Sequence, residues 1–377
     1  LYIIVCLLVP SMNNPIAYIL GFGLLSRGLD ISWLFQGLED FKKITARNTM
    51  VKLLGVVSIF LFVKKPSDLY LYITLIVVYD LLGQLSMWLP ARENIRKPHL
   101  DLVYAKQHIK PVVLLFLPQI AISLYITLDR TMLGALSSTK DVGIYDQALK
   151  LINILLTLVT SLGSVMLPRV SNLLSSGNKK AVNKLHEMSF LVYNLVIFPM
   201  IAGILIVNND FVQFFLGQDF QDARYAIAIM VFRMFFIGWT NIMGIQILIP
   251  HNRNREFMLS TTIPAIFSVG LNLILIPPLG YIGASIVSVV TEGLVWLIQL
   301  YFTSDYLKEV KILPSMLKIL LAAFLMYGAL YFIKTFINFS SVVNVLICSV
   351  LGFLVYGGLV LILRILDFQE LKSIIKK

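Results

Sequence analysis

The sequence predicts an all-α, polytopic membrane helix bundle, and its composition and its long apolar runs are the observations behind this prediction. Of the 377 residues, 58% are hydrophobic and only 14% are charged, with a mean hydropathy of +0.85. Soluble domains carry about 25% charged residues. Apolar runs that supply the roughly 20 residues of a spanning helix recur from one end of the chain to the other. No stretch remains for a separate soluble domain.

Apolar runs separated by short polar turns predict eleven complete spans and one partial span. The partial span, residues 1–9, starts inside an apolar run without the charged segment that opens a secretory signal. We therefore expect residue 1 to be internal to a longer protein. The complete spans are expected at 15–29, 49–63, 69–88, 111–128, 146–167, 188–207, 225–249, 258–276, 281–302, 314–335 and 342–365.

The distribution of Lys and Arg over the connections predicts the orientation, because these residues accumulate in cytoplasmic loops. One set of alternate connections carries 22 of them and the other set carries 5. The smaller set is Lys64, Lys65, Lys140, Arg224 and Lys334. The richer side is therefore expected to face the cytoplasm. The net charge of +11 then follows from topology, and a nucleic-acid partner is not expected.

The loops offer little room for chemistry. The longest connection runs from Leu89 to Lys110, which is too short for a catalytic domain outside the membrane. The four histidines fall in predicted loops at spacings that metal sites do not use. Cys6 and Cys348 lie in separate apolar segments, where buried structural thiols are expected. No metal site, cofactor or disulfide framework is predicted.

Charged residues inside the predicted spans are the candidate functional groups. A charge at the bilayer centre costs about 2.5–3.5 kcal/mol, so such side chains usually face the protein interior or a water-filled cavity. The clearest cases are Asp80, Asp129, Arg130, Arg233 and Glu292. They either pair across helices and hold the bundle in register, or line a transport path. Arg233 has apolar neighbours and no acid nearby in sequence, which favours a cavity.

The stretch from Leu29 to Asn48 concentrates charge directly after an apolar run. On one continuous helix, Gln36, Asp40, Lys43 and Arg47 would recur at i, i+4, i+7 and i+11 and form a polar stripe. Glu39 would then lie one turn before Lys43. Trp33 is expected near the membrane boundary, and Gly37 permits a close helix approach or a bend. Physical chemistry alone predicts a salt-bridged cytoplasmic helix hairpin.

The same stretch, DISWLFQGLEDFKKITARN, resembles the signature of the Wzx-type polysaccharide repeat-unit flippases for O-antigen and capsule, which belong with the MATE-like (MOP) exporters. The segment ITLDRTMLGALSSTKDVGIYDQALKL resembles the same family's seventh helix and the turn into its eighth. The residues that carry the first resemblance are Asp30, Trp33, Gln36, Gly37, Glu39, Lys42 and Arg47. Those that carry the second are Asp129, Gly134, Gly143 and Tyr145.

The resemblance implies a MATE-like, two-lobe transporter whose lobes of six helices each face a central cavity. Residues 1–110 would be the C-terminal part of the first lobe, helices 3 to 6 of the family, with a connecting loop. Residues 111–312 would form the second lobe, helices 7 to 12, and residues 313–377 two additional C-terminal helices. The family's first two helices and part of the third are missing from this sequence.

The resemblance also implies a function in a bacterial cytoplasmic membrane. An undecaprenyl-pyrophosphate-linked oligosaccharide repeat unit would move from the cytoplasmic to the outer leaflet by alternating access, for surface polysaccharide assembly. A polysaccharide polymerase and a chain-length regulator are the protein partners that it suggests. The chain would not be an enzyme. It has no phosphate-binding P-loop, so energy would come from an ion gradient or from consumption of the product.

An anionic head group in a membrane cavity requires cations, and a glycan requires polar side chains. An Arg fork suits phosphate oxygens. The candidate cavity residues are Arg130, Arg233, Asp129, Gln119 and Gln246, with Asn153 as a further polar candidate. The amides could equally link helices to one another. The coupling-ion candidates are Asp80 and Glu292, with Asp129 as a further carboxylate that could carry a proton.

Other functions stay open at this stage. A MATE-type drug or cation exporter should place acids rather than arginines at the cavity centre, and Arg233 argues against it. A lipid II flippase fits the motif at Asp30 to Asn48 less well than the polysaccharide branch does. A multi-spanning polymerase, ligase or glycosyltransferase should carry reactive residues in a large external loop, and the external loops are short. A membrane scaffold leaves the buried charges unexplained.

Overall fold

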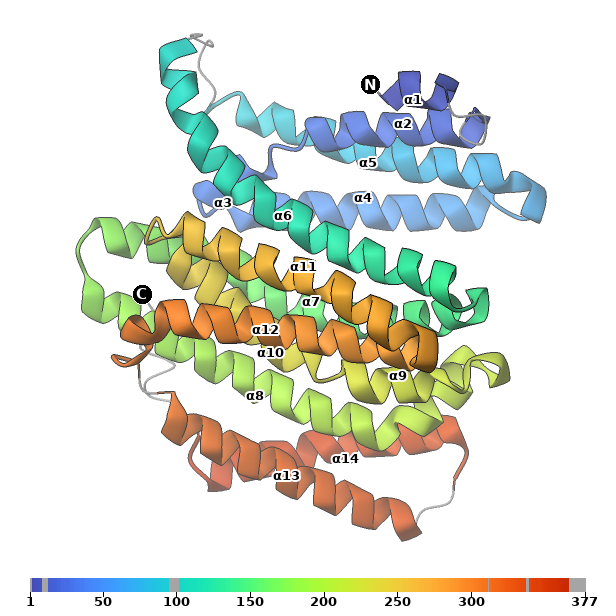
Figure 1. Cartoon of the computed structure of the whole chain (residues 1–377), viewed down its shortest axis with the longest axis vertical. Coiled ribbons are helices and arrows are strands. Elements are labelled where there is room, and N and C mark those ends of the chain that lie inside the picture. The colour runs from blue at the N-terminus through green and yellow to red at the C-terminus, as the bar shows by residue number, and fades with distance from the viewer. Residues whose placement is uncertain (1, 9–12, 95–101, 311, 337–338, 366–377) are drawn as a thin grey trace. The chain divides into compact units, whose positions relative to one another are not determined.

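The computed structural model describes residues 2–8, 13–94, 102–310, 312–336 and 339–365, without some side chains inside the helices. Within these ranges every regular element is a helix. The chain divides into two compact units, residues 1–101 and residues 102–377 (Figure 1). The predicted all-α class is therefore confirmed. The three parts expected from the resemblance, with boundaries after residues 110 and 312, stay a prediction.

Unit 1, residues 1–101, contains α1 (Tyr2–Leu8), α2 (Pro15–Gly28), α3 (Ser32–Gly37), α4 (Phe41–Phe62) and α5 (Leu69–Ala91). Both α2 and α4 pack against α5. Asn14 caps α2, because its side-chain oxygen accepts a hydrogen bond from the Ala17 backbone N–H (2.9 Å), and Pro15 follows at the first helical position.

The predicted continuous polar stripe of Gln36, Asp40, Lys43 and Arg47 is wrong, because the helix is interrupted. α3 ends at Gly37 and α4 begins at Phe41, with Glu39 between them at φ 58°. Lys43 pairs with Asp40 (3.0 Å) rather than Glu39. The stretch is a short helix, a tight turn and a second helix, so Gly37 serves a bend.

Unit 2, residues 102–377, holds the remaining helices. They are α6 (Leu102–Leu136), α7 (Thr139–Ser175), α8 (Lys179–Phe211), α9 (Ala223–Met230), α10 (Arg233–Thr240), α11 (Asn254–Leu279), α12 (Tyr281–Leu307), α13 (Leu313–Phe336) and α14 (Ser341–Ile362). Its largest apolar core joins α6, α7, α8, α9, α10 and α12. α11 packs between α6 and α12, as Figure 1 shows.

The pair α13 and α14 packs on α8, at the edge of unit 2 in Figure 1. Lys334 of α13 pairs with Asp210 of α8 (2.6 Å) and also donates to the Ile206 carbonyl (2.7 Å). Asn344 of α14 donates to the same Asp210 carboxylate (3.1 Å), and Tyr356 donates to the Leu195 carbonyl (2.9 Å). These bonds fix the pair to unit 2, because buried polar groups in an apolar surrounding need partners.

Nine helices of the described residues are long and apolar enough to cross a membrane. They match nine of the eleven complete spans that the sequence predicts. α2 is one of the other two, and its 14 residues fall short of a span. α6 contains the span expected at 111–128, but part of its side chains lies outside the described set. The chain is a multi-pass membrane protein.

The span expected at 225–249 is present as Ala223–Leu248, but its hydrogen bonding changes twice along its length. α9 ends at Met230, α10 starts at Arg233, and a π-helix, η5 (Asn241–Leu248), follows directly. At the break the Met234 N–H bonds to the Val231 carbonyl (3.1 Å), the tighter i→i+3 pattern. No proline or glycine lies at this point, so packing against neighbouring helices, rather than local sequence, determines where the helix breaks. Breaks and π-segments inside helices occur often at functional sites.

Side chains of α8 hold the π-helix η5 in place. His186 Nε2 donates to the Gln246 carbonyl (3.1 Å) and Ser189 to the Gln246 side-chain oxygen (2.8 Å). One turn further, the Tyr193 hydroxyl donates to Asn241 Oδ1 (2.6 Å). A Cβ on Gly244 would lie 2.7 Å from the Phe257 ring, so η5 approaches α11 at a distance that only glycine permits.

Candidate functional site

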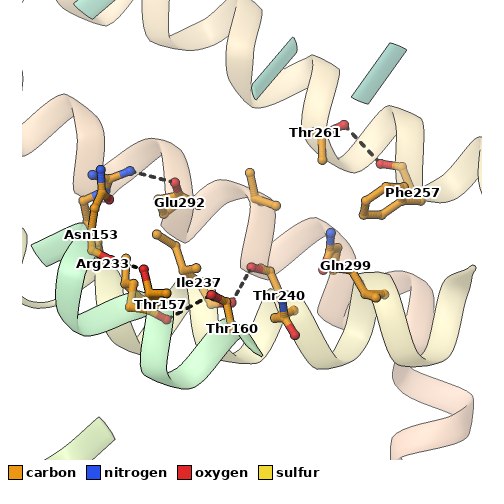
Figure 2. A pocket seen from close by; sticks show the side chains of 14 residues that line it. Asn153, Thr157, Thr160, Arg233, Ile237, Thr240, Phe257, Thr261, Glu292 and Gln299 are labelled. Carbon is orange, nitrogen blue, oxygen red and sulfur yellow. Dashed lines mark hydrogen bonds and ion pairs between the residues drawn. The ribbon is translucent and has the colours of Figure 1, made fainter. Parts of the chain in front are cut away.

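Unit 2 contains an open-sided cavity of about 390 Å³ between α7, α10, η5, α11 and α12. This volume lies within the range of small-ligand sites, roughly 300–1,000 Å³. Figure 2 shows the side chains that line it, from helices far apart in the sequence. Its polar lining consists of Asn153, Thr157, Thr160, Arg233, Thr240, Asn241, Thr261, Glu292 and Gln299. A cavity with polar side chains set in a largely apolar wall can hold a ligand that has both polar and apolar parts.

Arg233 and Glu292 form the charged end of this cavity. An Arg233 Nη2 lies 3.1 Å from a Glu292 Oε1, and the side chains are 2% and 6% exposed. Arg233 opens α10 directly after the break, with Ile237 and Thr240 on the same face at i+4 and i+7. The helix break thus places the guanidinium at the start of the cavity-lining face.

Burial makes this ion pair energetically demanding. Each ion loses several kcal/mol of hydration in a low-dielectric interior, and good geometry only partly restores that loss. Removing one partner of such a pair typically costs about 3–5 kcal/mol, because the other charge stays buried. Apolar side chains of similar volume would cost less, so the retained charges indicate a function.

The threonines of the cavity wall are hydrogen-bond acceptors toward the cavity. Thr157 donates its hydroxyl to the Asn153 carbonyl (2.9 Å), Thr160 to the Leu156 carbonyl (3.0 Å) and Thr240 to the Ile237 carbonyl (3.1 Å). Since each hydroxyl proton is used by its own helix, the oxygen lone pairs remain for a ligand donor. Figure 2 shows these hydroxyls beside the cavity.

Gln299 provides a further acceptor, near Phe257 at the other end of the cavity from Arg233 (Figure 2). Its side chain is 1% exposed, and its Nε2 donates to the Ser260 hydroxyl (3.1 Å). Its Oε1 is buried and has no hydrogen-bond partner among the described residues. A buried amide oxygen without a donor loses about 1–3 kcal/mol, which a ligand hydroxyl would restore.

Asp129 sits in an enclosed polar cluster of unit 2, close enough to Arg233 and Glu292 to interact with their charges. This α6 side chain is 1% exposed and accepts hydrogen bonds from Asn272 Nδ2 on α11 (2.6 Å) and from the Tyr145 hydroxyl on α7 (3.2 Å). The cluster joins three helices at one carboxylate. It does not line the cavity.

Some candidates from the sequence lie away from the cavity. Arg130 pairs with Asp146 (2.9 Å) and its side chain is 41% exposed. Gln246 is fully buried and bonded to α8, an arrangement that links helices. The side chain of Gln119 lies outside the described residues. Asn153, by contrast, lines the cavity.

In unit 1, Asp80 accepts a hydrogen bond from the Ser26 hydroxyl (2.6 Å), which joins α5 to α2. The signature stretch packs mainly through apolar residues that the sequence analysis did not select. Ile31 and Phe35 are buried against Met87 and Ala91 of α5.

The polar residues of the signature lie around this small core. Asp30 accepts from the Ser32 N–H (2.8 Å) and Arg47 donates to the Ser32 hydroxyl (3.0 Å), so both support the turn into α3. Trp33 is 68% exposed, and Gln36 is half-buried. Gly37, Glu39 and Lys42 are exposed. The signature therefore forms a helix-turn-helix corner, and its polar residues do not converge on one point.

Six polar residues of the cavity were not predicted from the sequence: Thr157, Thr160, Thr240, Asn241, Thr261 and Gln299. A periodic signal was available, because Asp146, Lys150, Asn153, Thr157 and Thr160 recur at i, i+4, i+7, i+11 and i+14 along α7. Single threonines in apolar helices are common, which hid this stripe. Among the described residues no three His, Cys, Asp or Glu side chains gather as a metal site.

Membrane-length helices around a polar cavity with a buried ion pair are the architecture of a membrane transporter. Residues 1–174 match the family model described as "Polysaccharide biosynthesis protein", and residues 115–277 match "MatE". Over these residues the chain is similar to the polysaccharide biosynthesis and MATE families. Relatives of known name in the comparisons are transporters and flippases rather than enzymes.

Several curated proteins are similar to the chain. A "Putative O-antigen transporter" of Escherichia coli (strain K12) is 27% identical over 79% of this chain and 73% of its own length. The "Probable low-salt glycan biosynthesis flippase Agl15" of Haloferax volcanii is 22% identical over 59% of this chain and 47% of its own. An uncharacterized membrane protein of Methanocaldococcus jannaschii is 26% identical over 61% and 45%. The chain thus spans about half the length of these last two relatives.

Among solved structures, "Lipid II flippase MurJ, inward closed conformation" superposes with a TM-score of 0.66 at 14% identity. The match covers 93% of this chain and 72% of that one. At this identity the likeness concerns the fold alone, so the arrangement of helices is MurJ-like.

Proposed function

We propose that the protein is a flippase for an undecaprenyl-pyrophosphate-linked oligosaccharide repeat unit. It moves the unit from the cytoplasmic to the outer leaflet of a bacterial cytoplasmic membrane by alternating access, for surface polysaccharide assembly. The observation that carries the proposal is the buried Arg233–Glu292 pair at one end of a polar cavity within membrane-length helices. The names of the O-antigen transporter and glycan flippase relatives support the same substrate class.

The anionic part of the substrate is assigned to Arg233. A guanidinium presents a planar set of N–H donors that match phosphate oxygens in pairs. Inside a low-dielectric cavity this attraction is far stronger than in water. Arg130, half-exposed beside Asp146, does not line the cavity, so Arg233 is the cation assigned to the head group there.

The glycan is assigned to the neutral polar wall. Sugar hydroxyls are donors as well as acceptors, and Thr157, Thr160 and Gln299 offer acceptor oxygens. Asn153 and Asn241 add amide groups to the same cavity. An anion at one end and hydroxyl groups along the wall together describe a phosphorylated sugar better than an organic cation.

The alternative of a drug or cation exporter is less well supported. Such a site would use Glu292 rather than Arg233 of the same ion pair, whereas the names of the O-antigen transporter and glycan flippase relatives support an anionic substrate. The coupling step of the proposed flippase is assigned to carboxylates within the spans. Asp129 is the most enclosed of them, with Asp80 held by Ser26 in unit 1.

Cells deleted for the full-length gene provide the test. Lipids extracted from them should contain an undecaprenyl-linked repeat unit that accumulates on the cytoplasmic side, while surface polymer disappears. Restoring the gene should reverse both effects. Repeat units that reach the outer face unpolymerised would instead indicate a polymerase. Normal amounts of both would turn the assignment toward a drug exporter.

A further inference from the structure

We propose that Glu292 is an internal competitor of the substrate: its carboxylate occupies Arg233 in the empty cavity, is displaced by the substrate's anionic group, and reclaims Arg233 to release it. This inference rests on the proposed function, since it concerns the same cavity and the same anion. It assigns Glu292 a positioning role that controls affinity and release, distinct from carrying a coupling ion.

The geometry provides the competition. The Glu292 carboxylate meets Arg233 at 3.1 Å from a different helix, α12 against α10, and both side chains line the cavity. The guanidinium meets Glu292 through one Nη2, so a phosphate that binds Arg233 would bring its negative charge beside the Glu292 carboxylate. Glu292 and a bound phosphate cannot both lie in full contact with Arg233 without bringing two anions together.

The two helices also differ in how firmly they are held. Arg233 stands directly after the break between α9 and α10, with i→i+3 hydrogen bonds at that point. Glu292 lies in the middle of the continuous α12, one turn before Trp296. The Arg233 side is therefore the one whose backbone has an irregular, adjustable segment next to the ion pair.

The electrostatic consequence has a definite sign. Binding an anion to Arg233 places negative charge beside Glu292 and draws the guanidinium away from its present partner, and both effects weaken binding. Replacing the carboxylate by an amide removes both penalties and keeps the shape. The substrate should then bind more tightly and leave more slowly, so transport should fall although affinity rises.

The test uses the purified full-length protein in lipid nanodiscs, with inorganic pyrophosphate as the probe in calorimetric titrations. Glu292→Gln should bind pyrophosphate about tenfold more tightly than the unaltered protein, with reduced transport in cells. Glu256→Gln is the matched control. Glu256 pairs with Arg253 at 3.0 Å in the same unit, partly exposed and away from the cavity, so its loss should leave affinity unchanged.

The outcomes separate this inference from the proposed function. Equal or weaker pyrophosphate binding by a folded Glu292→Gln protein overturns the competition. Where Glu292→Gln does not fold, Glu292→Asp provides the test. The Glu292→Asp protein, whose shorter carboxylate competes less well for Arg233, should bind pyrophosphate severalfold more tightly than the unaltered protein. Equal or weaker binding again overturns the competition. Unchanged binding by Arg233→Gln would instead remove the anion site on which the proposed function depends.

Discussion

The two units differ sharply in how deeply they bury helices of similar length. In the most apolar stretch of Ala223–Leu248 in unit 2, 56% of the residues are buried, whereas in Phe41–Phe62 of unit 1 only 6% are. The charged residues follow this contrast: Arg233 lies in the most enclosed span and is paired with Glu292, while Asp80 of unit 1 is half-buried and held by Ser26. Burial in unit 2 therefore excludes solvent from Arg233 and Glu292, so that the two are paired in the protein interior.

The largest expected effect comes from breaking the buried pair of unit 2. Arg233→Ala in the full-length protein should abolish surface polymer at a normal protein level, because the cavity loses its cation and Glu292 stays buried. Immunodetection of polymer and of protein checks this. In unit 1, Lys52→Ala on the exposed face of α4 is the matched loss of a cation and should leave polymer unchanged. Polymer retained in Arg233→Ala would contradict the assignment.

A substitution at the contact between η5 and α11 tests the tight packing of the same region. Gly244→Val should lower the stability of the full-length protein by about 1–3 kcal/mol, because the added carbons meet the Phe257 ring. Thermal unfolding in detergent measures the change. Gly270→Val is the control, since a Cβ there has no neighbour within 4 Å in the described structure. Equal losses of stability for both variants would show that the contact between Gly244 and Phe257 is no tighter than an ordinary lipid-facing position.

The two acids Asp129 and Asp80 sharpen the comparison between the units. Asp129→Asn leaves the donors of Asn272 and Tyr145 facing an amide, which should cost about 1–3 kcal/mol and reduce transport on the order of tenfold. Asp80→Asn loses one hydroxyl contact and should reduce transport less. Polymer production at matched protein levels compares them, and a larger effect at Asp80 would reverse the ranking.

The smallest effect concerns topology and should leave function intact. Asp219, exposed in the connection between α8 and α9, is predicted to face outward. A cysteine at this position in a full-length protein without other reactive cysteines should label with an impermeant reagent in intact cells. Labelling that appears only after lysis would invert the orientation deduced from Lys and Arg.

The spans could be predicted from the sequence because hydropathy and length are local properties. The expected runs at 258–276 and 281–302, for example, correspond to α11 and α12. The break before Arg233 was not predictable, since no proline or glycine marks it and the packing of α7, α8 and α12 around it decides the backbone. The prediction for the signature stretch was wrong for a similar reason, because a charge spacing that fits a continuous helix gave no sign of the turn at Glu39.

The site was only partly accessible from the sequence. Arg233 and Glu292 stood out individually as charges in apolar runs, but their pairing joins residues 59 positions apart. The bond from Asn272 to Asp129 spans 143 positions, and nothing local in the sequence signals it. Gln299 was missed because one amide in a long helix carries no pattern, whereas its unpartnered oxygen is visible only once the helices are assembled.

The central claim is that the cavity of unit 2 receives the lipid-linked glycan, and in-cell photocrosslinking tests it most directly. A photoreactive amino acid at Thr157, on the cavity wall, should yield an adduct of the full-length protein that carries undecaprenyl-linked glycan. The same group at Phe60 of α4, which is 74% exposed, should not. Glycan adducts at Phe60 but not at Thr157, or at neither position, would contradict the account.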